Sequence, residues 1–138
     1  MKANWYYIEQ QQYAEALDLI AEMEEMSKED KINKIYSIAA ILLLHLIRQQ
    51  AEKRTARSWE LSIRNSVRQI ARINRRRKDG GVYLDTDGLQ MIIDEAYQPA
   101  LERAALESFE GRYDDRESGQ LVEQNSIRQK AISLITSH

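Results

Sequence analysis

A single histidine within an apolar run is the residue best suited to catalysis or metal binding. His45 interrupts the run Ile38–Ile47, and Glu22 and Glu25 precede it on a segment that could approach it as an antiparallel helix. A histidine with carboxylates can hold a metal ion or exchange a proton. Helical di-metal proteins use paired Glu-x-x-His motifs on facing helices, however, and the chain contains none. We therefore predict a buried histidine that hydrogen-bonds to a carboxylate or to the helix of Trp59, and keep a metal-dependent enzyme centred on His45 as an alternative.

A row of arginines forms the second candidate site. Arg64, Arg68 and Arg72 follow one another at intervals of four, so they share one face of a helix, and Arg75 and Arg76 extend the row. Cations along one face can displace the counterions of a nucleic acid. No aromatic residue stands between the arginines, and no helix-turn-helix pattern precedes them. The arginines could equally pair with acidic residues of the chain itself, and the sequence leaves both alternatives open.

Other chemistries find no support in the sequence. The absence of cysteine excludes disulfides, thiolate catalysis and cysteine-bound metals. Asp85-Thr86-Asp87-Gly88 is a fragment of a calcium loop without the remaining ligands, so Asp87 is expected to cap a helix. Acidic segments flank the arginines and would be repelled by anionic lipid, which disfavours a membrane-surface role. We expect no cofactor.

The apolar pattern predicts helices and no sheet. Apolar residues recur at spacings of three, four and seven, and no alternation with a period of two persists. The nearly all-apolar middle of the second helix predicts that it is central in a bundle. We expect Ser27 and Ser58 to cap the second and third helices, Gly80-Gly81 to end the third and Pro99 to kink the fourth. The expected helices cover residues 4–26, 28–52, 58–78, 88–110 and 121–135.

These elements predict an all-α, single-domain helical bundle of four to five helices. A chain of 138 residues fits one domain. We expect a bundle over residues 1–111, with a polar loop and C-terminal helix at 112–138 packed on the same domain. The opening MKANWYY lacks the apolar core of a signal peptide. The longest apolar run is also far below the roughly 20 residues that span a bilayer, so we expect no transmembrane segment and a cytoplasmic location.

The charges are segregated along the chain although the net charge is only −2. Residues 1–30 hold two lysines and eight acids, residues 48–78 hold eleven basic and two acidic residues, and residues 79–138 hold five basic and twelve acidic residues. The distribution of charge, and not its total, therefore bears on binding. These signs suit internal pairing as well as an anionic partner.

The chain contains LLLHLIRQQ at residues 42–50 and RSWELSIRNSVRQIARI at residues 57–73. These two segments resemble the core of the bacterial helical family called domain of unknown function 29. The most specific part of the resemblance is a histidine in a leucine run followed, about fourteen positions later, by Ser58-Trp59.

The resemblance extends to both sides of this core. ALDLIAEMEEMSKEDK at residues 16–31 is similar to the family's acidic helix, and DEAYQPALERAALESFEG at 94–111 resembles its closing helix around Ala96-Tyr97. The resemblance, over about residues 16–111, implies a compact helical bundle that is common in bacteria, notably cyanobacteria, and has no established activity.

The sequence favours a non-enzymatic helical interaction protein that binds a protein partner or itself. No nucleophile–base pair, phosphate loop or metal-ligand cluster points to an enzyme, although the sequence leaves that question open. Self-association is suggested by the last helix and the aromatics at residues 5–7, which could leave apolar surface uncovered. The first alternative is a nucleic-acid-binding accessory or regulatory protein that uses the arginine face of residues 54–78. Trp59 is the expected structural anchor of the arginine-bearing helix. The candidate binding residues are Arg64, Arg68, Arg72, Arg75 and Arg76.

Overall fold

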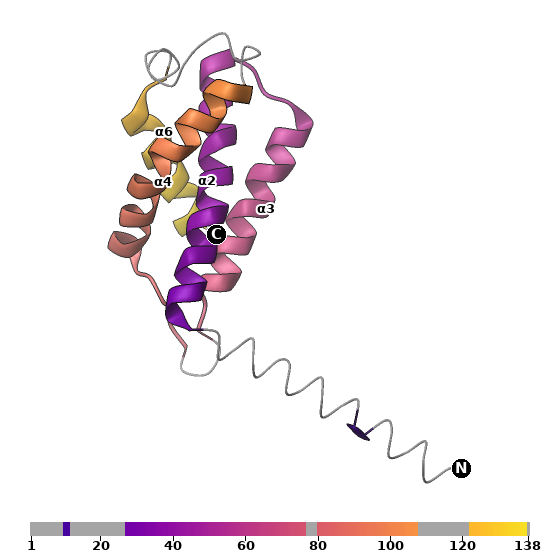
Figure 1. The fold of residues 1–138 in the computed structure, drawn as a ribbon, viewed down its shortest axis with the longest axis vertical. Helices are drawn as coiled ribbons and strands as arrows, with labels where there is room; N and C mark the ends of the chain where they lie inside the picture. Colours follow the sequence, from indigo (N-terminus) through magenta and orange to yellow (C-terminus); the bar gives the residue numbers. More distant parts are fainter. Residues whose placement is uncertain (1–9, 12–26, 77–79, 108–121, 138) are drawn as a thin grey trace, which may run out of the picture.

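The computed structural model describes residues 10–11, 27–76, 80–107 and 122–137 (Figure 1). These ranges contain the helices α2 (Lys28–Glu52), α3 (Arg57–Asn74), α4 (Thr86–Glu107) and α6 (Gln124–Thr136). Within them there is no strand, and an isolated bridge joins Arg75 to Val82. The fold is therefore all-α, as predicted. The helix expected over residues 4–26 lies outside the described residues, apart from the helical pair 10–11.

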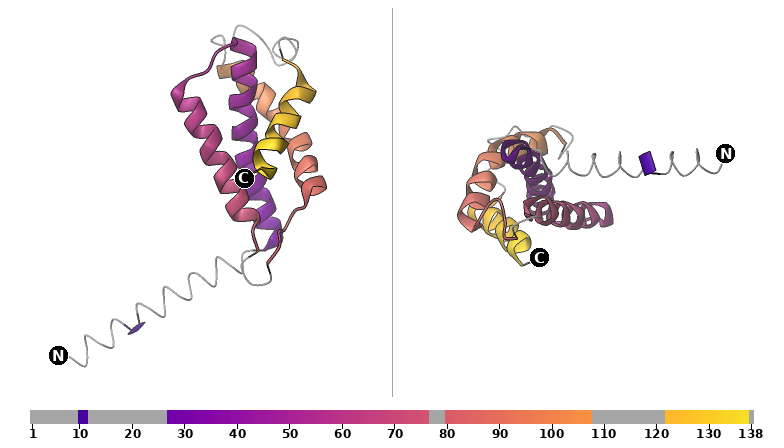
Figure 2. Two further views of the ribbon diagram at one scale, coloured as in Figure 1. Left: turned by 180° about the vertical axis from the view of Figure 1, so that it is seen from behind. Right: turned by 90° about the horizontal axis from the view of Figure 1, so that it is seen from below.

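α2 lies at the centre of the bundle because apolar side chains surround it. Its buried residues include Ile35, Leu42, Leu43 and Ile47, none of which is exposed to solvent. α3 and α4 lie on opposite sides of α2, and α6 packs on α4, α2 and α3 (Figure 2). A helix that is apolar nearly all round requires such neighbours to remove its surface from water.

The ends of α2 agree with the sequence prediction. The Ser27 hydroxyl accepts a hydrogen bond from the backbone N–H of Asp30 at 3.1 Å, which caps the N-terminus. At the other end Lys53 adopts a left-handed conformation, with φ 53°, and its N–H bonds to the carbonyl of Gln49. Both devices act within a few residues of the helix end, so the local sequence contains the information that defines them.

The predicted ends of α3 were wrong at both termini. Ala56 is the N-cap, in an extended conformation without a side-chain hydrogen bond, and Ser58 lies inside the helix. The helix ends at Asn74 and not at Lys78. The Asn74 side chain binds the backbone of Leu84, so the chain after Asn74 turns back along the helix. Asn74 Nδ2 donates to the Leu84 carbonyl at 2.9 Å, and the Leu84 N–H donates to Asn74 Oδ1 at 2.8 Å. Gly80 and Gly81 have φ values of 69° and 74°, so they form the turn after α3 and not its final cap.

α4 begins two residues earlier than expected. Asp85 Oδ1 accepts a hydrogen bond from the Gly88 N–H at 2.8 Å, so Asp85 caps the helix in place of Asp87. The helix continues through Pro99, which is exposed, and changes direction midway along its length (Figure 1). A proline inside a helix removes one backbone hydrogen bond, and its exposure leaves that carbonyl near solvent.

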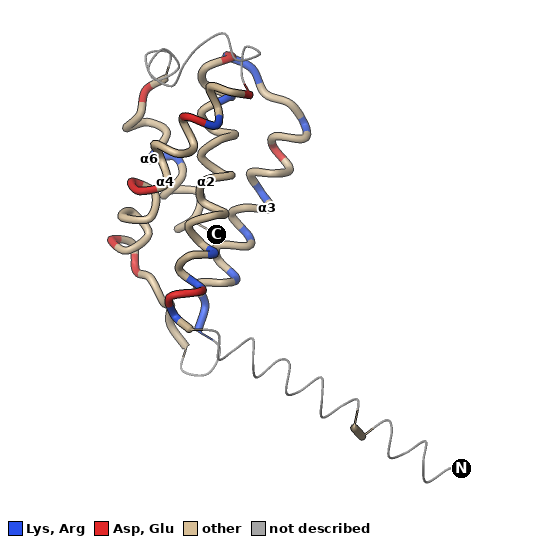
Figure 3. The backbone as a smooth tube through the Cα atoms, in the orientation of Figure 1, with Lys and Arg blue, Asp and Glu red and all other residues tan. Residues whose placement is uncertain are grey.

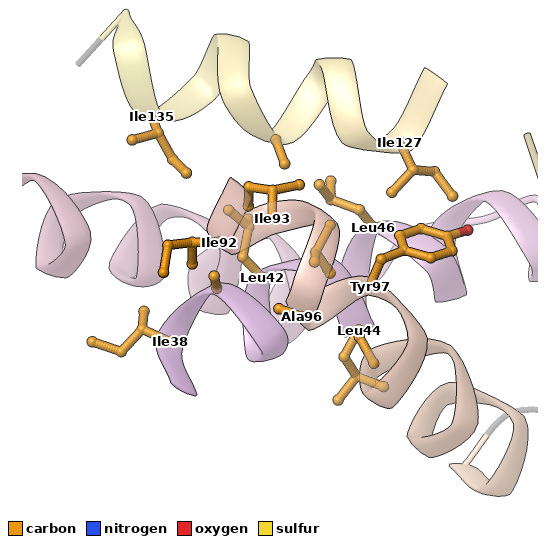
Figure 4. Close-up of a cluster of buried hydrophobic side chains, with 14 of the residues drawn as sticks. Ile38, Leu42, Leu44, Leu46, Ile92, Ile93, Ala96, Tyr97, Ile127 and Ile135 are labelled. Atoms are coloured by element: carbon orange, nitrogen blue, oxygen red, sulfur yellow. The ribbon is translucent and has the colours of Figure 1, made fainter. Parts of the chain in front are cut away.

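α6 buries one row of apolar side chains against the bundle. Ile127, Ala131 and Ile135 are spaced four residues apart and are all buried, above the core formed by α2 and α4 (Figure 4). The Gln50 side chain of α2 accepts a hydrogen bond from the Glu123 N–H just before α6. This helix therefore does not supply the uncovered apolar surface on which self-association was predicted.

The Ala96-Tyr97 pair of α4 lies in the same core. Ala96 and Tyr97 are 0% and 1% exposed. Burial raises the pKa of the Tyr97 phenol to about 12, although the Arg128 guanidinium, 4.8 Å from the ring centre, opposes this shift. Arg128 Nη1 also lies 3.5 Å from Asp94 Oδ1, which joins α6 to α4. None of the helices in the described ranges is both long and apolar enough to cross a membrane.

The Asn74–Leu84 contact should contribute measurably to stability. Asn74→Ala removes both hydrogen bonds and leaves two backbone groups of Leu84 without this partner, so we expect a loss of about 2 kcal/mol in the free energy of unfolding. Asn65→Ala, an exposed site on the same helix, is the control and should change it by less than about 0.5 kcal/mol. Equal effects of the two substitutions in urea unfolding would contradict the assignment.

Candidate interaction surface

His45 is half-buried on α2, and the predicted hydrogen bond to a carboxylate or to α3 is not formed among the residues that the structure describes. Its Nδ1 atom is buried without a partner in the described part of the chain. Burial lowers the pKa of His45 below 6.5, the nearby Arg48 lowers it further, and Glu107 opposes the shift. The side chain is therefore predominantly neutral at pH 7. Glu22 and Glu25, its proposed metal-binding partners, lie outside the described residues, and the described ranges hold no group of three or more potential metal ligands.

Trp59 lies at the junction of α2 and α3 and packs against two guanidinium groups. It is 7% exposed, and the guanidinium carbons of Arg48 and Arg54 lie 4.5 and 4.6 Å from its ring system. Glu52 holds both arginines in place, with Oε2 3.1 Å from Arg48 Nε and Oε1 3.1 Å from Arg54 Nη2. We call Arg48, Glu52, Arg54 and Trp59 the tryptophan clamp. Cation–π contacts and ion pairs reinforce one another here because Arg48 and Glu52 are largely buried.

The tryptophan clamp also reaches α4. Arg48 Nη1 lies 3.6 Å from Glu107 Oε2, and Glu107 Oε1 lies 3.0 Å from Arg103 Nε. The Glu107 carboxylate of α4 is therefore shared between two arginines, one of them from the clamp. Arg54, which belongs to the basic segment of the sequence, is exposed, but its guanidinium group is engaged by Glu52 and Trp59.

The arginines of α3 beyond the clamp face solvent. Arg64, Arg68 and Arg72 lie on the side of the helix opposite its buried residues, and Arg75 follows them. All four are exposed, and none forms an ion pair within the described ranges. We call Arg64, Arg68 and Arg72, which share the face of α3, the arginine row. Figure 3 shows these basic positions along the outer side of α3.

The acids of α4 do not neutralise the arginine row. Asp94 pairs with Arg128 of α6, and Glu107 pairs with Arg48 and Arg103. The acidic and basic helices lie on opposite sides of α2 (Figure 3), so α2 keeps them apart. Within the described residues, the arginine row therefore has no internal partner on α4. The acids of residues 9–25 lie outside the described ranges.

Arg76 has a different environment from the arginine row. Its guanidinium carbon lies 5.7 Å from the centre of the Tyr83 ring, and Lys31 Nζ lies 4.4 Å from the same centre and donates to the Tyr83 hydroxyl at 2.7 Å. The backbone of Arg76 also bonds to the Gly81 carbonyl at 3.1 Å. Tyr83 thus fixes the turn after α3 against the start of α2.

A groove of about 430 Å³ runs between α2 and α3 beside the arginine row. Apolar side chains line it from α2, and hydroxyl and amide side chains line it from α3, together with Leu61, which is 47% exposed. The lining residues are Ile38, Ile41, Ser58, Leu61, Ser62, Asn65, Ser66 and Gln69. Sequence reasoning missed this groove, but the recurrence of small serines at 58, 62 and 66 was a signal that one side of α3 does not fill the space beside α2.

The structure defines a small all-α protein with a capped central helix, a clamp around one tryptophan and an exposed cationic helix face. The chain belongs to the family described as Domain of unknown function DUF29, whose model matches residues 7–114. This range includes α2, α3 and α4 and ends before α6. Of the residues that carried the resemblance, Trp59 belongs to the clamp and Ser58 lines the groove. His45 lies on α2, near Arg48 of the clamp.

Beyond this family, no similar protein is found. No curated protein and no solved structure matches the chain significantly. The family assignment therefore supplies no activity, ligand or partner.

Trp59 should contribute more to stability than any residue on the outer face of α3. Trp59→Ala removes a buried ring and the stacking partner of two arginines, and we expect it to lower the free energy of unfolding by about 3–5 kcal/mol. Glu60→Ala is the matched control, because Glu60 is the exposed neighbour, and it should change stability by about 0.5 kcal/mol or less. Chemical unfolding that gave similar values for both would show that the clamp does not anchor α3.

His45 should make the protein less stable in acid. The pKa of His45 is lower in the folded state than in the unfolded chain, where it is near 6.5, so the unfolded chain takes up the proton first as the pH falls. The stability due to neutral His45 is present above pH 6.5 and is lost toward the lower folded pKa. His45→Gln cannot take up this proton, so it should lose less stability than the parent between about pH 7 and pH 5. The free energy of unfolding is measured in urea at both pH values. An equal loss between them in the parent and in His45→Gln would contradict this prediction.

Proposed function

We propose that this protein is a non-enzymatic interaction protein that binds an acidic polypeptide on the outer face of α3. The supporting observation is the arginine row, whose three exposed side chains have no anionic partner within the described part of the chain. Like charges four residues apart on a helix destabilise it by roughly 0.2–0.5 kcal/mol per pair. An anionic partner would remove that repulsion, so the free protein is poised to gain from binding one.

The surroundings of the arginine row favour a polypeptide over a nucleic acid. The adjacent groove offers exposed Leu61, together with amide and hydroxyl groups from Asn65 and Gln69, to a partner. This mixture suits peptide backbone and side chains. No aromatic side chain stands in the row to stack on a base. A nucleic acid is nevertheless the alternative, because phosphates would meet the same guanidinium groups.

Substitution of the row tests the proposal directly. Poly-L-glutamate serves as the probe for an acidic polypeptide and a short DNA duplex as the probe for the alternative, with binding followed by fluorescence anisotropy. We expect Arg64→Ala/Arg68→Ala/Arg72→Ala to weaken poly-L-glutamate binding about tenfold, since three exposed charge contacts at roughly 0.5 kcal/mol each amount to about 1.5 kcal/mol.

A second triple variant provides a control of equal charge. Lys28→Ala/Lys34→Ala/Lys130→Ala also removes three exposed cations, but from α2 and α6. It should retain most of the binding. An equal loss in both variants would mean that net charge alone attracts the probe and would overturn the proposal. Strong binding to DNA with a steep salt dependence, without binding to poly-L-glutamate, would establish the alternative instead.

A further inference from the structure

The outer face of α4 carries the charge opposite to that of α3. Asp87, Asp94, Glu95 and Glu102 are all exposed on this helix. α4 contains five acids and one arginine, whereas α3 contains four arginines and one glutamate. The molecule therefore presents a basic helix on one side of α2 and an acidic helix on the other.

The two exposed rows also have the same spacing along their helices. In α3 the positions are Arg57, Leu61, Arg64, Arg68 and Arg72, and in α4 they are Asp87, Met91, Asp94, Gln98 and Glu102. Both rows advance by four, three, four and four residues, which keeps each row on one side of its helix. Each row has an exposed apolar residue at its second position, with Leu61 47% and Met91 64% exposed. The remaining positions are basic in α3, and acidic or amide in α4.

We infer that the acidic polypeptide bound by the arginine row is α4 of a second copy of this chain. This inference rests on the proposed function and names its partner. Charge complementarity, the equal spacing of the two rows and the apolar residue in each support the pairing of these two helices. Arg64 and Arg72 of one copy would contact Glu102 of the α4 row and Glu95, which lies two helical turns before Glu102 and borders the row, on the next copy.

The position of the two helices determines what kind of assembly follows. α3 and α4 lie on opposite sides of α2 (Figure 2), and the arginine row forms no ion pair with α4 in the same copy. One copy can therefore bind a neighbour through α3 and another through α4. Such a heterologous contact produces a ring or an open chain of copies, and not a closed two-fold dimer.

Residues 9–25 of the same chain are the competing occupant, since they also contain acids. We favour α4 because its acids are exposed in a row that matches the spacing on α3. The test must therefore separate these two sources of negative charge.

Charge exchange between the two helices provides that test. One variant, Arg64→Glu/Arg72→Glu, reverses two charges of α3, and the other, Glu95→Lys/Glu102→Lys, reverses two charges of α4. Asp94 is left unchanged because it pairs with Arg128, and Asp87 because it lies in the first turn of α4. Circular dichroism and thermal unfolding of each variant verify that the fold is retained.

The readout is the average mass in sedimentation and light scattering. We expect the wild-type mass to rise above that of the 16.1 kDa monomer with concentration at about 0.05 M salt, and to return to it at about 0.5 M salt, where charges are screened within a few ångströms. Each variant alone should remain monomeric, because its reversed positions would then meet side chains of their own sign on the neighbouring copy. An equimolar mixture should associate again, because each altered row meets a complementary one.

Three outcomes would overturn the inference. The first is a wild-type protein that stays monomeric at every concentration and salt. The second is an α4 variant that associates as well as the wild type while the α3 variant does not, which would favour residues 9–25 as the occupant. The third is a mixture of the variants that fails to associate although both are folded. If the arginine row still accounts for binding to poly-L-glutamate in these cases, the proposed function stands and only its partner is wrong.

Discussion

The burial of α2 is the constraint on which the rest of the structure depends. The segment Ile38–Ile47 is apolar apart from His45, so no side of the helix can face water without cost. Three helices cover it, and each contributes the apolar side of an amphipathic sequence. Because the apolar sides of α3 and α4 pack against α2, their charged outer sides face solvent.

Polar contacts determine where α3 begins and ends against α2. At one end Arg48 and Arg54 lie over Trp59, and at the other the Asn74 side chain binds the backbone of Leu84. Between these ends small polar side chains border a groove and do not interdigitate closely with α2. Directional interactions thus act at the termini of α3, and apolar packing acts along its buried side.

Features that depend on neighbouring residues could be predicted from the sequence, and features that depend on distant ones could not. The all-α fold and both ends of α2 follow from local apolar spacing and from capping at Ser27. The true end of α3 depends on a partner ten residues away, so the glycines after it gave the wrong limit.

The candidate site shows the same division. The spacing of the arginine row placed its residues on one face, but the sequence could not tell whether α4 would neutralise them, because that depends on which side of α2 each helix occupies. Ser58 was misassigned as a cap because α3 begins one residue before it, at Arg57, and its N-cap Ala56 has no side-chain hydrogen bond that a sequence pattern could reveal. His45 was expected to be buried and hydrogen-bonded, whereas it is half-buried and its Nδ1 atom has no partner in the described part of the chain, which depends on how the helices pack.

The exposed outer face of α3 has a consequence for how proteins with this bundle can differ from one another. Because α3 is fixed through Trp59 and Asn74, the residues on its outer face make no contact on which the fold depends. Substitutions there are nearly neutral for stability, so they can change what the face binds without unfolding the bundle. Relatives with the same bundle can therefore differ in binding preference through a single helix face, while the clamp and the buried residues of α2 maintain the fold.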